Sequence, residues 1–278
     1  MKTKRIEKTP TCEKVKFMME KMTIGEIEQK LLIERSRDDA FIQFLKKDER
    51  KGVQKVLAKW EKLCAKEELL QKKFVEMTSF EREIRKQGFQ LIAGIDEAGR
   101  GPLAGPVVAA AVILPEEFYL PGIDDSKKLS EQSREEYFAY IQSEAIAVGV
   151  GIIDAQEIDS INILEAAKKA MLNAVSELTV SPDYLLVDAV KLETPYPAEA
   201  LIKGDARSVT IAAASIIAKV TRDRLMKEID KEYPHYGFAS NMGYGTAVHL
   251  DALRNYGVTP YHRKSFSPVK EYDRTIVE

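Results

Sequence analysis

The chain of 278 residues contains little cysteine and little histidine, and both shortages argue against whole classes of site. Cys12 and Cys64 are its only cysteines, and neither belongs to a CxxC or Cys/His cluster, which argues against a disulfide framework. His235, His249 and His262 lack the spacing of zinc ligands, which argues against a zinc centre. So few cysteines are typical of a protein from a reducing compartment.

Long apolar runs are also missing. No stretch approaches the ~18 apolar residues of a membrane-spanning helix. The N-terminal sequence MKTKRIEKTPTCEKVKF has no apolar segment of the kind found in a secretory signal. We therefore expect a cytoplasmic protein without a membrane partner. A hydrophobic content of 45% allows a sizeable core, in one large domain or in a medium domain with an appendage.

Charge of either sign is abundant, but it is unevenly distributed along the chain. Residues 1–86 hold 23 lysines and arginines against 16 acidic residues, whereas the remainder holds 19 against 28. A basic appendage beside an acidic body fits a polyanion partner for the former and a metal-binding cleft in the latter. The alternative is that acids and bases alternate on solvated helix faces, and charge alone favours this alternative.

The patterning divides the chain near residue 78. Residues 1–77 show apolar residues at helical spacing and few helix breakers, which predicts a small all-α extension that could aid substrate binding. Thr23–Glu26 has the form of a capping box, as does Thr78–Glu81, and Gly88 is placed to end the helix that follows. Residues 78–278 would then form the second domain.

From Phe89 onward the pattern is that of a mixed α/β domain. An antiparallel connection through residues 98–105 joins the first two strands. The predicted strands are Phe89–Ile95, Val107–Leu114, Ala145–Ile153 and Tyr184–Val190, and the predicted helices are Ser130–Glu144, Ile163–Leu178 (capped by Asn162), Ser208–Tyr233 and Thr246–Tyr256.

Four carboxylates fall at the ends of these elements. Asp96 and Glu97 follow the first strand, Asp188 lies at the carboxyl end of Leu185–Val187, and Asp205 precedes the long helix. Taken singly, Asp188 is an ordinary strand-end residue and Asp205 an ordinary helix cap. If the four converge, their repulsion calls for a hard cation such as Mg²⁺ or Mn²⁺.

One geometric condition applies to the first pair. Adjacent residues of a regular strand point to opposite faces. Asp96 and Glu97 therefore share one cleft only if the strand breaks at Ala98-Gly99.

Three further segments could contact a polyanion, and each has a simpler interpretation. The backbone of Gly99-Arg100-Gly101 could approach phosphate or sugar hydroxyls, or could simply close a hairpin. Ser126 and Lys127 could bind phosphate, or could form a polar turn. Tyr244 lies between glycines and could stack on a sugar or base, or fold back onto the core.

Two other segments carry weaker signals. His262-Arg263-Lys264-Ser265 is a basic cluster that could contact a nucleic-acid backbone or merely lie on the surface. Residues 212–215, Ala-Ala-Ala-Ser, suggest close helix packing rather than a functional element.

Six blocks of this sequence resemble bacterial type 2 ribonuclease H (ribonuclease HII) in their order and residues. They are GIDEAGRGPLAGPVVAAAVIL, DSKKLS, LLVDAV, KGDARSVTIAAASIIAKVTRD, GYGT and TPYHRKSF, and they cover about residues 78–268. Arg100 between the glycines favours this family over the related ribonuclease HIII, where lysine is typical. Residues 1–77 resemble the helical extension of some Gram-positive members.

The resemblance implies a ribonuclease-H-like fold, a mixed and mostly parallel sheet flanked by helices with a helical C-terminal part. Asp96, Glu97, Asp188 and Asp205 match the family's catalytic, metal-binding carboxylates. Gly99, Arg100 and Gly101 match the loop that reads the ribonucleotide 2′-hydroxyl, and Tyr244 matches the tyrosine that senses the RNA–DNA junction. The implied cofactor is Mg²⁺ or Mn²⁺, with two ions per site when substrate is bound.

The implied activity is endonucleolytic, metal-assisted hydrolysis of RNA in RNA–DNA hybrids and 5′ to ribonucleotides embedded in DNA, leaving 3′-hydroxyl and 5′-phosphate ends. The implied roles are ribonucleotide removal from DNA and primer clearance by a monomer with no obligatory protein partner. Two rival hypotheses are a non-catalytic nucleic-acid-binding module and a two-metal nuclease of other specificity. The first should lack a carboxylate, and the second should lack the Gly-Arg-Gly loop or Tyr244, but all are present.

Overall fold

The computed structural model describes residues 22–33 and 40–272. Cys12 and the N-terminal sequence considered above lie outside the described residues. The chain divides into two compact units, residues 1–72 and 73–278. The helix α4 (Lys51–Met77) crosses this division, and its Phe74 and Met77 are buried in a core cluster of the second unit. The predicted boundary between a helical extension (residues 1–77) and a catalytic domain (residues 78–278) stays a prediction.

The first unit is helical, as its patterning predicts. It contains α2 (Ile24–Ile33), α3 (Ala40–Leu45) and most of α4. The capping box before α2 is confirmed, because the Thr23 hydroxyl accepts from the Glu26 N–H at 3.3 Å while the Glu26 carboxylate accepts from the Thr23 N–H at 2.8 Å. The buried cluster of this unit comprises Ile27, Leu31, Phe41, Ile42, Leu45, Val53, Leu57 and Trp60.

The second unit is built on a five-stranded sheet in the order β3-β2-β1-β4-β5. Three strands, β1 (Ile92–Ala98), β2 (Val107–Ile113) and β3 (Ala147–Ile153), are antiparallel neighbours, as the short connection after β1 predicts. Two more, β4 (Tyr184–Asp188) and β5 (Ala198–Leu201), continue the sheet parallel to β1. The sheet is mixed as expected, but its pairings are evenly divided rather than mostly parallel.

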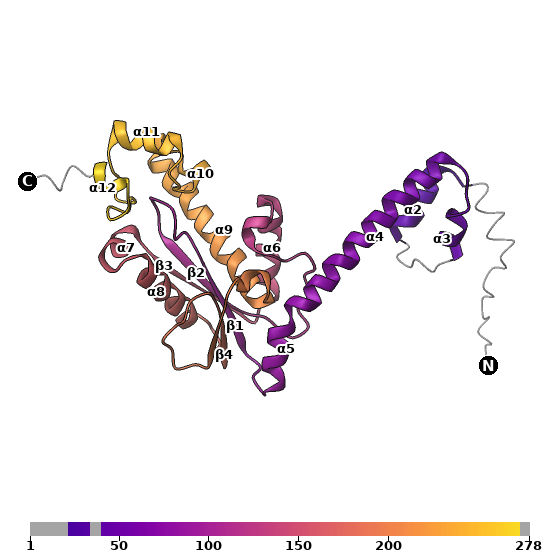
Figure 1. Ribbon diagram of the computed structural model, residues 1–278, viewed down its shortest axis with the longest axis horizontal. Coiled ribbons are helices and arrows are strands. Elements are labelled where there is room, and N and C mark those ends of the chain that lie inside the picture. Colours follow the sequence, from indigo (N-terminus) through magenta and orange to yellow (C-terminus); the bar gives the residue numbers. More distant parts are fainter. Residues whose placement is uncertain (1–21, 34–39, 273–278) are drawn as a thin grey trace, which may run out of the picture. The chain divides into compact units, whose positions relative to one another are not determined.

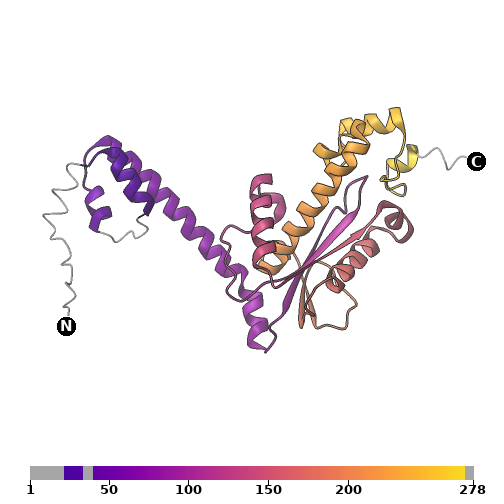
Figure 2. The same ribbon diagram turned by 180° about the vertical axis from the view of Figure 1, so that it is seen from behind.

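Helices cover both faces of this sheet (Figures 1 and 2). One face packs against α8 (Ile163–Ser176), whose alanines meet the inward residues of β1, β2 and β3. The other face packs against α9 (Val209–Glu232) and α6 (Glu131–Glu144). The remaining helices are α5 (Ser79–Lys86), α7 (Ala155–Ile161), α10 (Phe238–Asn241), α11 (Ala247–Tyr256) and α12 (Val269–Tyr272).

Every predicted strand and helix of the second unit is present, with small shifts at the ends. Asn162 caps α8 by accepting from the Leu164 and Glu165 N–H groups, and Ser208 caps α9. The prediction missed β5 and the short helices α7, α10 and α12. The four residues of β5 read Ala-Glu-Ala-Leu, and most of them are exposed, so they carry no apolar run. Within the described residues, no helix is long and apolar enough to cross a membrane.

Close approach of α9 to β1 depends on Gly94. A Cβ atom on this residue would lie 2.1 Å from the carbonyl carbon of Thr210, which belongs to the backbone at the start of α9. The helix N-terminus is therefore in direct contact with the strand that carries Asp96 and Glu97.

The predicted capping box at Thr78 is wrong, because Glu81 has a tertiary partner. The Thr78 side chain makes no capping bond, and its hydroxyl donates to the Val75 carbonyl. Glu81 is buried, and its Oε1 accepts from the hydroxyls of Ser208 and Thr210 at 2.6 and 2.8 Å and from the Thr210 N–H at 3.0 Å. The carboxylate thus ties α5 to the start of α9.

We predict that Glu81→Ala lowers the free energy of unfolding by about 3 kcal/mol, because buried donors lose their acceptor. Glu81→Gln should lose less, since it keeps an acceptor oxygen. Urea denaturation of both variants measures the difference. The control is Glu83→Ala, which removes an exposed carboxylate from the same helix. Equal stability of Glu81→Ala and this control would contradict the prediction.

Candidate active site

Two carboxylates meet at one edge of the sheet because their strands run parallel. Ile95 pairs with Val187 in the parallel register of β1 and β4, so Asp96 and Asp188 follow at the same level. Ligand sites in α/β sheets are usual at this carboxyl edge. The strand-end position predicted for Asp188 is confirmed, because it is the last residue of β4.

Asp205 reaches this edge from the β5 side of β4, opposite to β1. It lies in the short helix η2 (Gly204–Ala206), which follows β5 and precedes α9. The Gly204 N–H donates to Asp188 Oδ1 at 2.6 Å, which fixes η2 against the end of β4. Asp205 is buried and does not cap α9, since Ser208 does.

Asp96 and Glu97 lie inside β1 rather than after it. Antiparallel pairing with β2 continues through Ala98, which faces Val108, and the turn begins at Gly99 with a φ of 98°. The predicted end of the strand at Ile95 is therefore wrong, because pairing with β2 extends it. The two side chains nevertheless share one electrostatic environment, since Asp188 acts on both of them.

Burial and mutual repulsion disfavour the charged forms of these groups. Burial, then Glu97, raises the pKa of Asp96 well above its ordinary value, and a hydrogen bond with Ser215 opposes the shift. Burial also raises the pKa of Glu97, against the opposing effect of Arg100. Burial, then the neighbouring carboxylates, raises the pKa of Asp205. The cluster therefore attracts positive charge.

Lys127 supplies part of this positive charge. Burial opposes its charged form, but the carboxylates of Asp125, Asp96, Asp205 and Asp188 outweigh burial and raise the pKa of Lys127. Its Nζ lies 3.7 Å from Asp125 Oδ1, and most of its side chain is exposed. A side chain so placed is available to an anion that enters the site.

The donor set suits a hard divalent cation, because every charged donor is a carboxylate oxygen. Glu97 Oε2 is buried and has no hydrogen-bond partner among the described residues, so it is an open acceptor at the cluster. No group of three or more Asp, Glu, His or Cys side chains in the described residues is close enough together to hold an ion as the side chains lie. In the chemistry and charge of their oxygen donors, these carboxylates fit a divalent cation.

The Gly99–Gly101 loop directly follows Asp96 and Glu97 in the chain, and buried arginine side chains pack against its backbone. Arg100 makes an ion pair of 3.2 Å with Glu97. A Cβ atom on Gly99 would lie 2.0 Å from Nε of Arg222, so only glycine fits over this guanidinium. Arg222 itself is buried and donates to the carbonyls of Ala104, Pro106 and Met242 at 2.9 to 3.1 Å.

A second buried arginine binds the same loop. Arg263 donates to the Gly99 and Arg100 carbonyls at 2.5 and 2.9 Å and to the Gly105 carbonyl at 2.9 and 3.1 Å. The sequence left open whether the basic cluster at residues 262–265 is a surface feature. Arg263 is fully buried, and its neighbour His262 is nearly so. These two residues are therefore structural parts of the site.

Tyr244 lies beside this loop and is half exposed. A Cβ atom on Gly101 would lie 3.5 Å from Cε1 of Tyr244, which is van der Waals contact. The two segments are joined by the Leu103 N–H, which donates to the Gly243 carbonyl at 2.8 Å. The tyrosine is thus presented beside the Gly-Arg-Gly loop rather than folded into the core.

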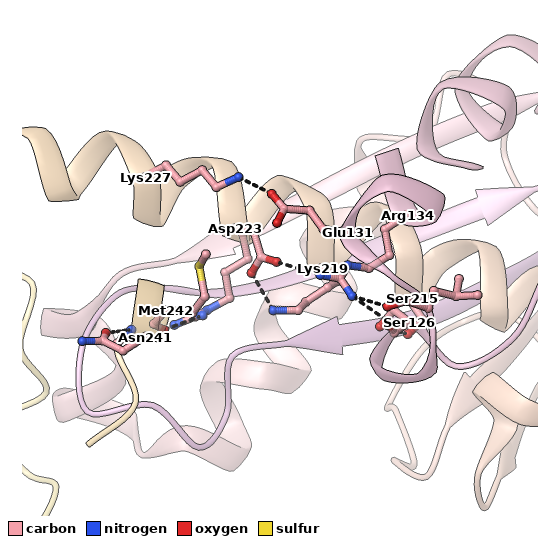
Figure 3. Close-up of polar contacts among 12 residues, drawn as sticks. Ser126, Glu131, Arg134, Ser215, Lys219, Asp223, Lys227, Asn241 and Met242 are labelled. Carbon is pink, nitrogen blue, oxygen red and sulfur yellow. Dashed lines mark hydrogen bonds and ion pairs between the residues drawn. The ribbon is translucent and has the colours of Figure 1, made fainter. Parts of the chain in front are cut away.

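Ser126 does not present its hydroxyl at the surface. Its side chain is buried, and its Oγ lies 3.0 Å from the Oγ of Ser215 on α9 (Figure 3). Ser215 in turn opposes the rise in the pKa of Asp96. The Ser126 hydroxyl is therefore not exposed to a phosphate. A phosphate contact by Ser126 stays a prediction.

Sequence reasoning missed four residues of this region. Asp125 was available in the block DSKKLS, and Ser215 was interpreted as helix packing. Arg222 and Arg263 carry no sequence signal of burial, because arginine is almost always exposed. The one sequence signal is Gly99, where a side chain would clash with the buried Arg222.

Comparison with known proteins identifies a family. A family model described as Ribonuclease HII matches residues 93–269, and one described as Ribonuclease HII N-terminal domain matches residues 23–85. A Ribonuclease HII of Bacillus thuringiensis (strain Al Hakam) is 57% identical over 256 residues, which cover 91% of this chain and 98% of the relative.

Solved structures show the same fold. Ribonuclease H2 from Pyrococcus horikoshii OT3 has a TM-score of 0.58 and 27% identity, over 66% of this chain and 97% of that one. Ribonuclease HII in a complex with PCNA from Archaeoglobus fulgidus has a TM-score of 0.56 and 28% identity, over 63% and 95%. The chain therefore belongs to the ribonuclease HII family and is a ribonuclease H, a metal-dependent endonuclease.

Proposed function

We propose that this protein hydrolyses the RNA strand of RNA–DNA hybrids and cuts 5′ to ribonucleotides embedded in duplex DNA. The observation that carries the proposal is the carboxylate cluster lying directly before a glycine loop that lies beside an exposed tyrosine. Cleavage leaves a 3′-hydroxyl and a 5′-phosphate. The corresponding roles are ribonucleotide removal from DNA and primer clearance, by a cytoplasmic monomer.

Asp96, Glu97, Asp188 and Asp205 are the proposed catalytic residues and metal ligands. Bound Mg²⁺ or Mn²⁺, in our proposal two ions, would neutralise their charge and act as Lewis acids toward water and the scissile phosphate. The carboxylates do not attack the phosphorus. They hold positive charge at one edge of the sheet, with Glu97 Oε2 as an acceptor still open.

Choice of substrate is assigned to the loop and the tyrosine. The 2′-hydroxyl is the group that separates a ribonucleotide from a deoxyribonucleotide, so an enzyme of this specificity must contact it. We assign that contact to Gly99, Arg100 and Gly101, whose backbone a ligand can approach closely. Tyr244 would stack at the RNA–DNA junction. Lys127 would bind the phosphate backbone, with the buried Ser126 holding the turn that carries it.

We predict that Asp96→Asn and Asp188→Asn each reduce metal-dependent cleavage by at least about 100-fold, the scale for losing one group that stabilises transition-state charge. A duplex with one embedded ribonucleotide, assayed with and without Mg²⁺ or Mn²⁺, is the test substrate. Glu193→Gln, which removes an exposed carboxylate elsewhere, is the control. Wild-type turnover in either variant would remove that residue from the site.

The same Asp96→Asn variant should melt at an equal or higher temperature than the wild type without metal. The folded-state pKa of Asp96 is raised, so its ionisation costs stability as the pH rises through that pKa. Below the ordinary carboxyl pKa both proteins are neutral at this position and the difference should vanish. Melting curves across pH measure the gain, and a gain confined to acid pH would contradict the argument.

Tyr244→Ala should impair cleavage at a lone ribonucleotide more than cleavage of a continuous hybrid, because only the former requires one junction to be sensed. The expected difference corresponds to a stacking loss of about 1–3 kcal/mol. The ratio of kcat/KM on the two substrates is the measurement. Tyr119→Ala removes an equally exposed ring and is the control. Equal losses on both substrates would make Tyr244 a general structural residue.

The first unit is assigned a role in substrate affinity, on account of its excess of basic residues. Three ion pairs within it, Lys46–Glu61, Arg50–Asp48 and Lys59–Glu28, favour the alternative in which acids and bases neutralise one another. Exposed lysines such as Lys62 and Lys66 on α4 would carry the phosphate contacts.

Removing residues 1–72 should raise KM, leave kcat nearly unchanged and flatten the salt dependence of binding. The truncation begins at Lys73, because Phe74 and Met77 belong to the core of the second unit. Titration of a hybrid duplex at several salt concentrations measures the slope. If the truncated and full-length proteins show the same salt dependence of binding, the basic residues of the first unit pair with its own acids and do not contact the substrate.

A further inference from the structure

Two histidines are buried behind Tyr244 and face one another. His249 lies on α11, and His262 lies in the segment that follows this helix. Their Nε2 atoms are 2.9 Å apart, and both side chains are almost completely buried. Neither residue takes part in the proposed chemistry, so a buried imidazole pair requires another explanation.

The partners of the pair fix where each proton lies. The Thr259 N–H donates to Nδ1 of His262 at 2.9 Å, so this nitrogen carries no proton. A neutral His262 is then protonated on Nε2 and donates to Nε2 of His249. His249 is left with its proton on Nδ1, which donates to the Tyr244 carbonyl at 2.9 Å. The hydrogen bonds therefore all donate in the same direction, from the Thr259 N–H through the two rings to the Tyr244 carbonyl.

A second proton on either ring would break this chain of hydrogen bonds. It would set two N–H groups against each other between the rings, or would oppose the Thr259 N–H at His262. Burial, then His249, lowers the pKa of His262 to about 3, and burial lowers the pKa of His249. Both rings are thus neutral at physiological pH, as the geometry requires.

The dipeptide His262-Arg263 connects both segments assigned to substrate choice. Arg263 binds the Gly99 and Arg100 carbonyls, while His262 acts through His249 on the Tyr244 carbonyl. The same short piece of backbone therefore sets the positions of the glycine loop and of the tyrosine relative to each other.

We propose that His249 and His262 are positioning residues that fix the backbone of Tyr244, and with it the ring that discriminates a lone ribonucleotide from a continuous hybrid. This inference rests on the proposed function of Tyr244. The simpler alternative is that the two rings only fill space, since they pack against Tyr236 and Phe238.

A matched pair of substitutions separates the two explanations. The amide nitrogen of asparagine takes the place of Nδ1, so His249→Asn keeps a donor for the Tyr244 carbonyl and loses the contact with His262. Glutamine places its amide at the position of Nε2, so His249→Gln keeps the contact with His262 and loses the donor. If the rings only fill space, both variants should lose the same activity.

The readout is the ratio of kcat/KM for a duplex with one ribonucleotide to that for a continuous hybrid, measured in full-length protein below the melting temperature of both variants. We expect His249→Gln to lower this ratio about tenfold, the equivalent of one hydrogen bond, and His249→Asn to preserve most of it. In a Tyr244→Ala background, His249→Gln should change the ratio no further.

Three results would overturn the inference. Equal ratios for the two His249 variants, or an unchanged ratio in His249→Gln where Tyr244→Ala does change it, would reject the positioning role alone. ¹⁵N spectra of the histidine rings at neutral pH should find His249 protonated on Nδ1 and His262 on Nε2, and the opposite tautomers would also reject it. An unchanged ratio in Tyr244→Ala would instead reject the function on which the inference rests.

Discussion

Two buried guanidinium groups determine the shape of the loop from Gly99 to Pro106 and of the turn at Met242. Arg222 and Arg263 direct their hydrogen bonds at backbone carbonyls between Gly99 and Pro106 and at Met242, and none of these bonds goes to a carboxylate. Burial lowers their pKa values to about 10 and about 9, so both stay charged at neutral pH. A buried charge is costly unless its donors are satisfied. The loops must therefore keep the conformation that turns these carbonyls inward, and the glycine backbone is preorganised in that form.

The carboxylate cluster follows from the order of the strands. Parallel pairing of β1 with β4 brings Asp96 and Asp188 to one edge, and η2 brings Asp205 to it. Burial and repulsion together raise carboxyl pKa values there. Cations bound there, as we propose, would relieve the cost of holding these charges together. The fold thus holds an unfavourable charge arrangement, which the proposed metal binding would compensate.

The loops and the carboxylates are coupled through short polar contacts. Arg100 pairs with Glu97 and its own carbonyl accepts from Arg263, so the ion pair and the buried network meet in one residue. The Ser126 and Ser215 hydroxyls lie in contact (Figure 3), and Ser215 opposes the rise in the pKa of Asp96. In the proposed mechanism, specificity and catalysis therefore share the contacts of Arg100.

By itself the sequence determined the strands and the long helices, because apolar periodicity and a cap such as Asn162 act locally. It also pointed to the carboxylates and the glycine loop, through their resemblance to one family. Only the tertiary structure decided that Asp96 and Glu97 lie within β1, since pairing with β2 extends that strand. It likewise decided that Glu81 is bound by Thr210 and that Arg263 is buried. Such partners come from distant parts of the chain, and no local pattern encodes them.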